Sequence, residues 1–233
     1  MASPPSYGAL ADLFNPGRAL APPQAQGQID GMDRHRVNLT RIQRALGASG
    51  GHSSDFDLNP DVRPAAGRPL LPASVLVALV ERGAELRVIL TRRASRLRHH
   101  PGQVSFPGGK QEPEDATPLD AALREAREEI GLMPEQVEVL GAFDRHETVT
   151  NFKVTPFVGL VAEGFVAVPD RAEVDEVFEV PLGFVLDPAN FQVHGRQWQG
   201  SWRRFHAIPY GPHYIWGATA RMLKTLAERM RDP

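Results

Sequence analysis

The chain has 233 residues, a hydrophobic content of 42% and a formal net charge of −2 at pH 7. A chain of this size can bury a sizeable core, and its small net charge argues against coating of nucleic acid or of an anionic membrane surface. Cysteine is absent, which excludes disulfide bonds, zinc-thiolate sites and a cysteine nucleophile. Because no apolar run approaches the roughly 18 residues of a membrane span and no secretory signal pattern is present, we expect a cytoplasmic location.

The predicted organisation has three parts. Residues 1–31 are rich in Pro, Gly and Ala and hold few large apolar residues, so we expect a flexible N-terminal tail. Residues 32–69 combine a short helix over Met32–Leu46, where apolar residues fall near helical spacing, with a loop rich in Gly and Pro. Residues 70–233 form the expected globular domain.

Apolar runs separated by turn residues predict the strands of this domain. The first two strands form a hairpin across residues 81–85, and the last two form a hairpin across residues 195–200. The predicted strands are Ser74–Val80, Leu86–Leu90, Val137–Phe143, Lys153–Val161, Phe165–Val168, Phe178–Val180, Phe191–His194 and Ser201–Ile208. Pro156 lies inside one of them, which predicts an edge strand or a bulge because proline cannot donate to a sheet.

Helices interrupt these strands. A helical turn is expected over Pro181–Leu186, and a terminal helix over Pro212–Arg231. The most clearly marked helix spans Pro118–Ile130, with Thr117 as its N-cap and Gly131 to end it. Strands broken by helices in this order favour an α+β fold with a mixed sheet over a doubly wound parallel sheet.

Three carboxylates share one face of the marked helix. Glu125, Glu128 and Glu129 stand at positions i, i+3 and i+4 and repel one another, which favours a bound cation. A hard divalent ion such as Mg²⁺ suits oxygen ligands of this kind. Arg124 and Arg127 lie between the acids, so a salt-bridged and solvated helix face is the alternative.

The segment from Arg124 to Leu132 reads REAREEIGL and resembles the core of the Nudix box. The usual box begins with Gly, five residues and Glu, followed by seven residues and the Arg. Here Gly109 precedes Asp115 by six positions and eight residues separate Asp115 from Arg124, so the front half carries an inserted residue and an Asp for Glu. This departure leaves a ligand role for Asp115 in doubt. The resemblance implies a mixed β-sheet sandwiched between helices.

A basic segment precedes the helix. Four Arg and two His fall between Arg92 and His100 without one acid, which suits phosphate recognition beside a metal site and also occurs on solvated surface. The run from Ile89 to Gly109 is similar to the signature of the coenzyme A pyrophosphatase branch of the Nudix hydrolases, departing from it at Ile89, where Leu is usual. The fixed positions are met by Leu90, Thr91, Arg93, Ala94, Arg98, Gly102, Phe106, Pro107, Gly108 and Gly109.

This second resemblance implies cleavage of the pyrophosphate of coenzyme A to 3′,5′-ADP and 4′-phosphopantetheine, with Mg²⁺ or Mn²⁺ as cofactor. Arg124 is expected to orient a helix carboxylate, and Glu128 or a loop acid, Glu173 or Glu176, is expected to act as general base. The implied metal ligands are Glu125, Glu128, Glu129 and the backbone of Gly109, and the implied substrate-binding residues are Arg93, Arg98, Gly102 and Phe106.

Several alternatives remain beside this interpretation. Trp198 and Trp202 are candidates either to stack an adenine or to pack in a core or interface. A Nudix hydrolase of ADP-ribose or a related nucleotide diphosphate is a second function, although the basic signature argues against it. A non-catalytic nucleotide-binding regulator is a third, and the intact helix carboxylates count against that one. The expected partner is a small molecule, with no nucleic acid or membrane, and both a monomer and a homodimer are left open.

Overall fold

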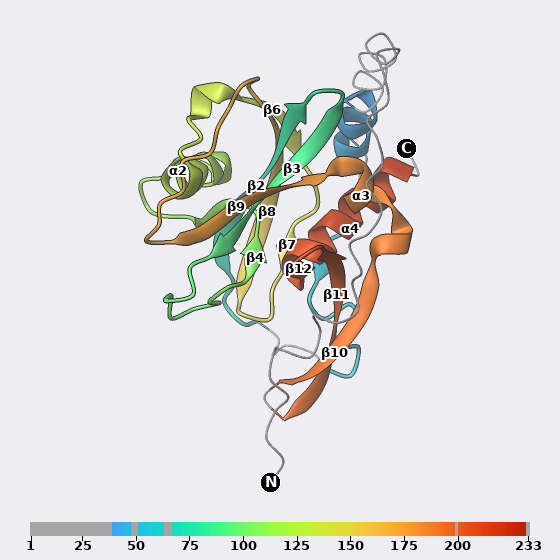
Figure 1. The fold of residues 1–233 in the computed structure, drawn as a ribbon. Helices are drawn as coiled ribbons and strands as arrows, with labels where there is room; N and C mark the ends of the chain where they lie inside the picture. The colour runs from blue at the N-terminus through green and yellow to red at the C-terminus, as the bar shows by residue number, and fades with distance from the viewer. Residues whose placement is uncertain (1–38, 48–50, 63–66, 199, 232–233) are drawn as a thin grey trace.

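The computed structural model describes residues 39–47, 51–62, 67–198 and 200–231, and the predicted tail lies outside them. They form a nine-stranded mixed sheet with helices on both faces, and a separate three-stranded sheet near the C-terminus (Figure 1). The larger sheet has the strand order β1-β7-β8-β2-β3-β4, with β5 paired to β2, β6 to β8 and β9 to β3. This is the mixed α+β arrangement that the sequence predicts.

The elements in chain order are mostly strands, with one long helix between β5 and β6 and another at the C-terminus. The strands are β1 (Ser53–Ser54), β2 (Leu71–Arg82), β3 (Glu85–Arg93), β4 (Val104–Ser105), β5 (Gly108–Lys110), β6 (Val137–Ala142), β7 (His146–Glu147), β8 (Phe152–Val161), β9 (Val174–Pro181), β10 (Gln192–Trp198), β11 (Ser201–Tyr210) and β12 (His213–Trp216). The helices are α2 (Pro118–Ile130), α3 (Leu182–Leu186), α4 (Ala218–Arg231) and the 3-10 turns η2 (Pro134–Gln136) and η3 (Pro188–Asn190), together with helical residues 39–47.

Strand β2 is buried on both faces, which explains why its sequence is an almost continuous apolar run. Successive side chains of a strand point to opposite faces, and here the two sets enter different cores. Leu76, Ala78 and Val80 pack in the cluster under α2, whereas Val77 and Leu79 pack in the larger cluster on the other face. The predicted hairpin of β2 and β3 is confirmed, with Arg82 paired to Glu85 at its turn.

Strand β8 lies in the interior of the larger sheet, because it pairs in parallel with β2 and antiparallel with β6 and β7. Of the two alternatives predicted for Pro156, the edge strand is therefore wrong, whereas the pairing of β8 with β6 does contain an irregularity. On the antiparallel side Pro156 lies opposite the break between Ala142, where β6 ends, and His146, where β7 begins. Its carbonyl accepts a hydrogen bond of 3.2 Å from the Phe143 N–H at this break. A proline is tolerated there because no neighbouring carbonyl requires its missing N–H.

Helix α2 begins and ends where the sequence predicts. The Thr117 hydroxyl accepts a hydrogen bond from the Asp120 N–H, and the Asp120 carboxylate accepts one from the Thr117 N–H, so both halves of a capping box are formed. Gly131 ends the helix in the left-handed conformation, with φ of 70°. The buried face of the helix, which packs against the sheet in the smaller core cluster, carries Ala122, Ala126 and Ile130.

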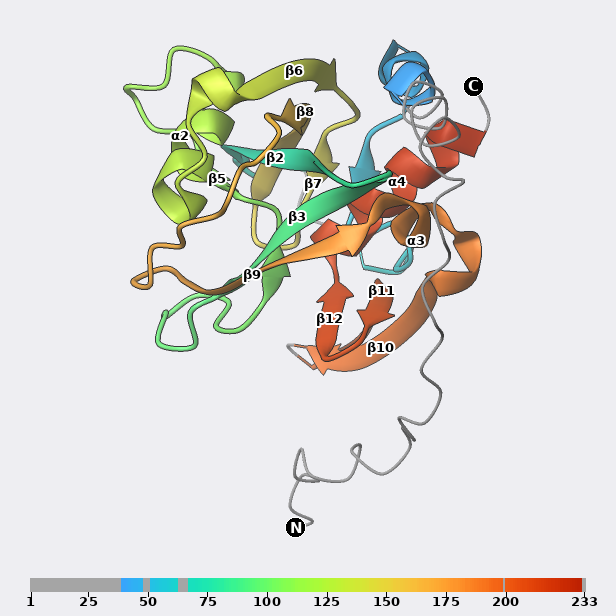
Figure 2. The same ribbon diagram turned by 45° about the horizontal axis from the view of Figure 1, so that its top comes forward.

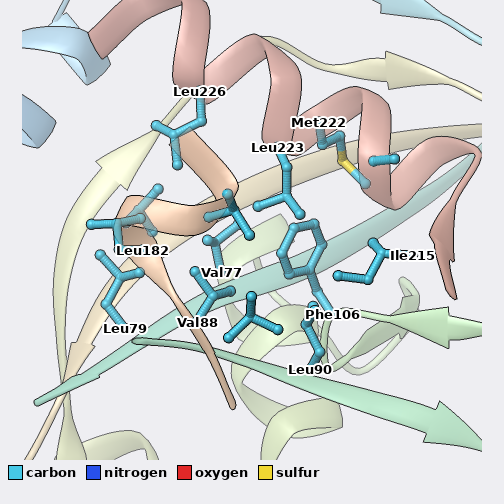
Figure 3. Close-up of a cluster of buried hydrophobic side chains, with 14 of the residues drawn as sticks. Val77, Leu79, Val88, Leu90, Phe106, Leu182, Ile215, Met222, Leu223 and Leu226 are labelled. Atoms are coloured by element: carbon cyan, nitrogen blue, oxygen red, sulfur yellow. The ribbon is translucent and has the colours of Figure 1, made fainter. Parts of the chain in front are cut away.

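The opposite face of the sheet is covered by α3, α4 and the helix of residues 39–47 (Figure 1). In this larger core, Phe106 and Leu223 lie close to the sheet side chains (Figure 3). Ile42 and Ala45 are fully buried in the same cluster, and the Ala45 carbonyl accepts a 3.0 Å hydrogen bond from Arg229 of α4. The helix of residues 39–47 thus contributes to the main core, although the proposed domain start at residue 70 excludes it. That boundary stays a prediction.

Two predicted elements differ from the structure. Residues 165–168 are not a strand, because the Val168 N–H donates to the Ile130 carbonyl (2.9 Å) and the segment forms a loop that closes the C-terminus of α2. The terminal helix starts at Ala218 instead of Pro212, since His213–Trp216 is strand β12 and buries Ile215 in the core. The late hairpin of β10 and β11 is confirmed.

Candidate active site

Helix α2 presents its three carboxylates at three different depths. Glu129 is buried, with 2% of its side chain exposed, whereas Glu125 is 16% exposed and Glu128 is 49% exposed. The spacing i, i+3, i+4 predicts a shared face, and packing of α2 on the sheet decides which end of that face is covered. A single turn of helix therefore carries one enclosed, one partly covered and one open carboxylate.

Arg124 links the helix carboxylates to the loop before the helix. Its Nε and Nη2 atoms each donate to a different oxygen of Asp115 at 3.0 Å, which is the paired geometry that guanidinium and carboxylate groups favour. Its Nη1 atom donates to Glu125 at 3.1 Å and to Glu128 at 2.9 Å. The hydrogen bonds to Asp115 raise the pKa of Arg124, and the bond from Arg124 holds the pKa of Asp115 below its usual range. Arg124 is thereby fixed against two helix carboxylates, and its role in orienting them stays a prediction.

Asp115 is the residue that sequence reasoning left in doubt. It is 8% exposed, and it also accepts a 2.8 Å hydrogen bond from the Glu112 N–H. Its two oxygens are engaged by Arg124, so in this structure Asp115 anchors the arginine. The Asp-for-Glu departure in the front half of the box leaves its role in doubt from sequence, and its partner is visible only in the folded chain.

The surroundings of Glu129 disfavour its charged form. Burial, followed by the charge of Glu125, raises the pKa of Glu129 to about 8, while Arg93 and a hydrogen bond from the Gly108 N–H oppose the shift. The Gly108 N–H lies 3.3 Å from Oε2, and Arg93 Nη1 lies 3.7 Å from Oε1. Burial also raises the pKa of Glu125, against the opposing charge of Arg124. Two neighbouring carboxylates are therefore held where a nearby cation would relieve both desolvation and mutual repulsion.

The pair Gly108-Gly109 lets β5 pass between β2 and α2. A Cβ atom on Gly109 would lie 2.3 Å from Oε1 of Glu125, and one on Gly108 would lie 2.4 Å from the carbonyl oxygen of Ser74. Side chains at either position would collide with the carboxylate or with the β2 backbone. These glycines bring the backbone of Gly109 directly against Glu125, next to the expected ligands.

The donor set suits a hard divalent cation. Glu125, Glu128, Glu129 and the nearby backbone of Gly109 offer oxygen atoms, the ligand type that Mg²⁺ and Mn²⁺ prefer. Within the described ranges, however, no three acidic or histidine side chains are assembled closely enough to hold a metal ion as they stand. Arg124 Nη1 bridges Glu125 and Glu128, and small side-chain rotations are needed before their oxygens converge. The residues fit the ion in chemistry, and the ligand set stays a prediction.

Glu173 lies on the loop that joins β8 to β9. The loop is held to α2 by a 3.0 Å hydrogen bond from the Asp170 N–H to the Glu129 carbonyl, and to the end of β3 by a 2.7 Å bond from the Ala94 N–H to the Glu173 carbonyl. The side chain of Glu173 is exposed, and its charge contributes to the raised pKa values of Glu125 and Glu129. The tertiary structure thus brings Glu173 to the carboxylates, and its role as general base stays a prediction.

Glu176 is the other loop acid that the sequence offers as a general base. Its carboxylate lies 3.1 Å from Arg92 and 3.6 Å from His213, so it forms ion-pair contacts at the junction of β3, β9 and β12. Its side chain also lines a large groove beside the carboxylates. Glu173 is the loop acid whose charge reaches the α2 carboxylates, whereas Glu176 is engaged elsewhere.

A large basic groove opens beside the carboxylates. It has a volume of about 1580 Å³ and extends from Gly108 and Arg93 to strands β11 and β12. Seven arginines but only three acids line it in the described parts of the chain, although the whole protein carries a net charge of −2. The arginines are Arg92, Arg93, Arg98, Arg196, Arg203, Arg204 and Arg221. A groove of this size and sign suits an elongated anionic ligand.

The four predicted substrate-binding residues occupy different positions in this groove. Arg93 is partly buried and reaches Glu129, whereas Arg98 is exposed and forms no ion pair within the described residues. Gly102 lies on the rim with φ of +69°, and its N–H donates to the Arg93 carbonyl at 3.1 Å. Phe106 is 1% exposed and packs in the larger core, so it supports the groove floor from beneath.

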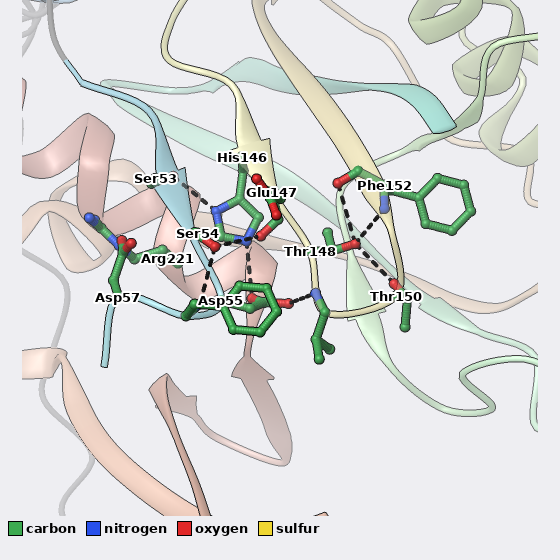
Figure 4. Close-up of polar contacts among 12 residues, drawn as sticks. Ser53, Ser54, Asp55, Asp57, His146, Glu147, Thr148, Thr150, Phe152 and Arg221 are labelled. Atoms are coloured by element: carbon green, nitrogen blue, oxygen red, sulfur yellow. Dashed lines mark hydrogen bonds and ion pairs between the residues drawn. The ribbon is translucent and has the colours of Figure 1, made fainter. Parts of the chain in front are cut away.

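The remaining wall of the groove was not predicted from the sequence. It includes the segment after β1, which is held by a buried chain of hydrogen bonds (Figure 4). Ser53 Oγ lies 2.9 Å from Nδ1 of His146, and Nε2 of His146 lies 3.0 Å from Asp55. Because Ser53 is 2% exposed and His146 is fully buried, this Ser–His–Asp chain is closed to a substrate and serves to fasten β1 to β7. No local sequence pattern predicts these contacts, because Ser53 and Asp55 lie more than 90 positions from His146.

Comparison with known proteins places this geometry in a family. The NUDIX domain model matches residues 70–199. The chain belongs to the Nudix family. It is 39% identical over 169 residues to an uncharacterized Nudix hydrolase, NudL, of Enterobacter sp. (strain 638), which covers 71% of this chain and 88% of that protein. The NudL of Citrobacter koseri is also 39% identical, over 155 residues, covering 66% of this chain and 80% of the relative.

Solved structures of Nudix proteins are also similar to this chain in part. The NUDIX domain of Shewanella oneidensis NrtR, crystallised with ADP ribose, is 16% identical with a TM-score of 0.46, covering 73% of this chain and 95% of that one. The Nudix hydrolase RenU of M. smegmatis is 25% identical with a TM-score of 0.39, covering 50% and 74%. At this level of similarity the two structures bear on neither substrate nor mechanism. This chain is a Nudix hydrolase with the mixed α+β fold of the family, and no helix in its described residues is long and apolar enough to span a membrane.

Proposed function

We propose that this Nudix hydrolase cleaves the pyrophosphate bond of coenzyme A, releasing 3′,5′-ADP and 4′-phosphopantetheine with the help of Mg²⁺ or Mn²⁺. The observation that carries the proposal is the joint match of Ile89–Gly109 and Arg124–Leu132 to the two signatures of the coenzyme A pyrophosphatase branch. The basic groove beside the α2 carboxylates supports it, because coenzyme A is elongated and carries phosphates both at the pyrophosphate and on the ribose.

In this proposal Glu125, Glu128 and Glu129 hold the divalent ion. When bound, the ion neutralises charge on the phosphate oxygens and lowers the pKa of a water molecule. Arg124, fixed by Asp115, sets the orientation of Glu125 and Glu128. Because Arg124 is held by two hydrogen bonds to Asp115, it can keep contact with one carboxylate while the other turns toward its ligand position.

The phosphates are bound by the arginines at the near end of the groove. Arg93 lies between Glu129 and the groove and is placed for the pyrophosphate, whereas exposed Arg98 is placed for a more distant phosphate. The proton of the attacking water passes to a carboxylate oxygen of Glu128 or Glu173. Glu128 is exposed on the helix face and Glu173 faces the same cluster from the loop, so substitution of each by Gln separates them.

The test is turnover of coenzyme A with Mg²⁺ or Mn²⁺ and identification of both products by mass. Release of 3′,5′-ADP and 4′-phosphopantetheine is expected. A panel with ADP-ribose and dephospho-coenzyme A provides the comparison, and a higher kcat/KM on ADP-ribose than on coenzyme A would overturn the proposal in favour of a nucleotide-sugar hydrolase. Absence of turnover on every diphosphate of the panel would point to a nucleotide-binding regulator.

A further inference from the structure

The three-stranded sheet β10–β12 forms a wall of the groove that the family match hardly reaches. The NUDIX domain match ends at residue 199, so β11 and β12 lie beyond it. Figure 2 shows this sheet apart from the larger sheet, with β12 lying nearest to it. Strand β12 contacts β4, which follows the basic loop of residues 94–103. The small sheet is therefore positioned to meet whatever ligand that loop binds.

One face of this sheet carries aromatic rings and arginines together. Residues paired across antiparallel strands lie on the same face, and the register pairs Arg196 with Arg203, His194 with Phe205, and Ala207 with Trp216. Alternation along β11 and β12 puts these residues and Tyr214 on one face. Those of this face that line the groove are Arg196, Arg203, Phe205, Tyr214 and Trp216.

The side chains of this face contact one another. The ring centroids of Phe205 and Trp216 lie 5.2 Å apart, and the guanidinium of Arg196 lies over the Trp216 ring at 4.6 Å. Arg203 has a buried Nε atom without a hydrogen-bond partner, and its guanidinium lies 5.4 Å from the centre of the Phe56 ring. Rings and guanidinium planes stack flat aromatic ligands, and an unpartnered guanidinium N–H suits an anion.

Residues of the aromatic face and of the basic loop line the same groove. Burial and then the charge of Arg93 lower the pKa of His100, and the charge of Arg196 contributes as well, which places Arg196 within electrostatic reach of the loop. Arg98, His99 and His100 line the groove on the loop side. A ligand that contacts both sets of residues carries a flat ring and negative charge. Inorganic pyrophosphate has no ring, and an apolar molecule has no negative charge.

We propose that the β10–β12 face binds the nucleoside half of the substrate, with its base stacked against Phe205, Trp216 and Arg196 and its ribose phosphate near Arg203. The assignment of that half as adenosine 3′-phosphate rests on the proposed function. The stacking role does not, because it follows from rings, guanidinium groups and groove lining. This wall then distinguishes nucleoside diphosphates from diphosphates that lack a base.

The test is equilibrium binding, which does not depend on turnover. Isothermal titration with 3′,5′-ADP, 5′-AMP and inorganic pyrophosphate would be run on the wild type, Phe205→Ala and Arg196→Ala. Removal of a side chain that stacks on a base weakens binding roughly tenfold or more. We therefore expect each variant to bind both nucleotides at least about tenfold more weakly and to bind pyrophosphate with unchanged affinity. Phe205→Leu keeps apolar volume without the ring, and it carries the same expectation if Phe205→Ala fails to fold.

Trp202→Ala is the matched control. Trp202 belongs to the same sheet and is 67% exposed, but it pairs with Gln197 on the opposite face, lies across Gly195 and does not line the groove. Its removal is expected to leave nucleotide binding within twofold of the wild type. Equal losses for Trp202→Ala and Phe205→Leu, wild-type nucleotide affinity in Phe205→Leu and Arg196→Ala, or no binding of either nucleotide to the wild type would overturn the inference.

The outcomes separate this inference from the proposed function. If coenzyme A is not cleaved but Phe205→Leu still weakens 5′-AMP binding tenfold, the base-binding wall stands and the identity of the substrate changes. If coenzyme A is cleaved and the variants bind both nucleotides normally, the wall is rejected and the activity stands. Trp202 does not line the groove, and the Trp198 side chain lies outside the described residues, so adenine stacking by either tryptophan stays an untested alternative.

Discussion

The acidic face of α2 and the basic groove are adjacent, yet the chain builds them in different ways. The three helix carboxylates come from five consecutive residues, whereas the groove arginines come from positions 92–98 and 196–221. Helical spacing alone aligns the carboxylates, because residues three and four apart share a face. The arginines meet only after β11 and β12 have folded against the end of the larger sheet.

This difference separates chemistry from recognition. A single turn of helix, with Arg124 and Asp115 behind it, carries the groups expected to hold the metal and move the proton. The groove is assembled from several loops and strands, so its shape and charge can change while the helix stays the same. Substitutions on α2 are therefore expected to affect kcat, and substitutions in the groove to affect the choice between substrates.

The largest effect is expected on the helix. Glu128→Gln or Glu129→Gln should lower kcat by about two orders of magnitude or more at saturating metal, since each removes a carboxylate that stabilises developing charge. The fold should persist, because burial already disfavours the charged form of Glu129. Steady-state kinetics and circular dichroism measure both, with Glu135→Gln on the exposed turn η2 as the control. Wild-type turnover in either variant would remove the metal-binding assignment.

A smaller and more selective effect is expected in the groove. Arg98→Ala should lose more kcat/KM on coenzyme A than on dephospho-coenzyme A, by about 1–3 kcal/mol if it binds the 3′-phosphate. Arg93→Ala should lose similar amounts on both substrates, because Arg93 contacts Glu129 beside the reacting groups. Arg96→Ala, on the same loop but not lining the groove, is the control. Equal losses for Arg98→Ala on both substrates would place Arg98 at the pyrophosphate or in the scaffold.

The next prediction concerns stability at the groove wall near α4. Burial, Lys224 and Arg221 lower the pKa of His206 to about 4 from the ordinary 6.5, while Glu228 and Asp57 oppose the shift. Below pH 6.5 His206 binds a proton in the unfolded chain but stays neutral in the folded chain. The contribution of neutral His206 to the free energy of unfolding is therefore present above pH 6.5 and is lost as pH falls toward 4.

At pH 5.5, which is one unit below the ordinary pKa of histidine, the free energy of unfolding falls by about 1.4 kcal/mol. Urea unfolding of the wild type and of His206→Gln at pH 7.5 and pH 5.5 measures it. The wild type should lose more stability than the variant between the two pH values, and other titrating groups cancel in the comparison. Identical pH dependence in the two proteins would mean that His206 is not buried in its neutral form.

The smallest effect is expected from removal of residues 1–31. Their Pro, Gly and Ala content buries too little apolar surface to offset the cost of ordering, so a chain starting at Met32 should keep its turnover of coenzyme A within a few-fold. A chain starting at residue 70 is the contrasting variant, because it lacks Ile42 and Ala45 of the larger core and should melt at a lower temperature.

A different result from the shorter truncation would assign the tail a role. A tenfold fall in kcat/KM, about 1.4 kcal/mol, with an unchanged Tm would mean that the tail covers the site or completes a dimer that forms it. Sedimentation of the truncated and full-length chains separates these two causes, since only the second changes the oligomeric state.

The sequence by itself determined the features that depend on neighbouring residues. Thr117, Asp120 and Gly131 define the ends of α2 because a capping box and a left-handed C-cap are local hydrogen-bond arrangements. The β2–β3 and β10–β11 hairpins follow from apolar runs joined by short turns. The shared face of Glu125, Glu128 and Glu129 follows from helical geometry.

The tertiary structure decided what depends on distant residues. It buried Glu129 and exposed Glu128, since the depth of each carboxylate depends on how α2 packs on the sheet. It placed Pro156 in an interior strand, because Pro156 lies opposite the break between β6 and β7, where its missing N–H leaves no ladder hydrogen bond unmade. It also made residues 165–168 a loop and left Trp202 outside the lining of the groove. Local periodicity carries no record of such contacts, because they form only when segments far apart in the chain pack together.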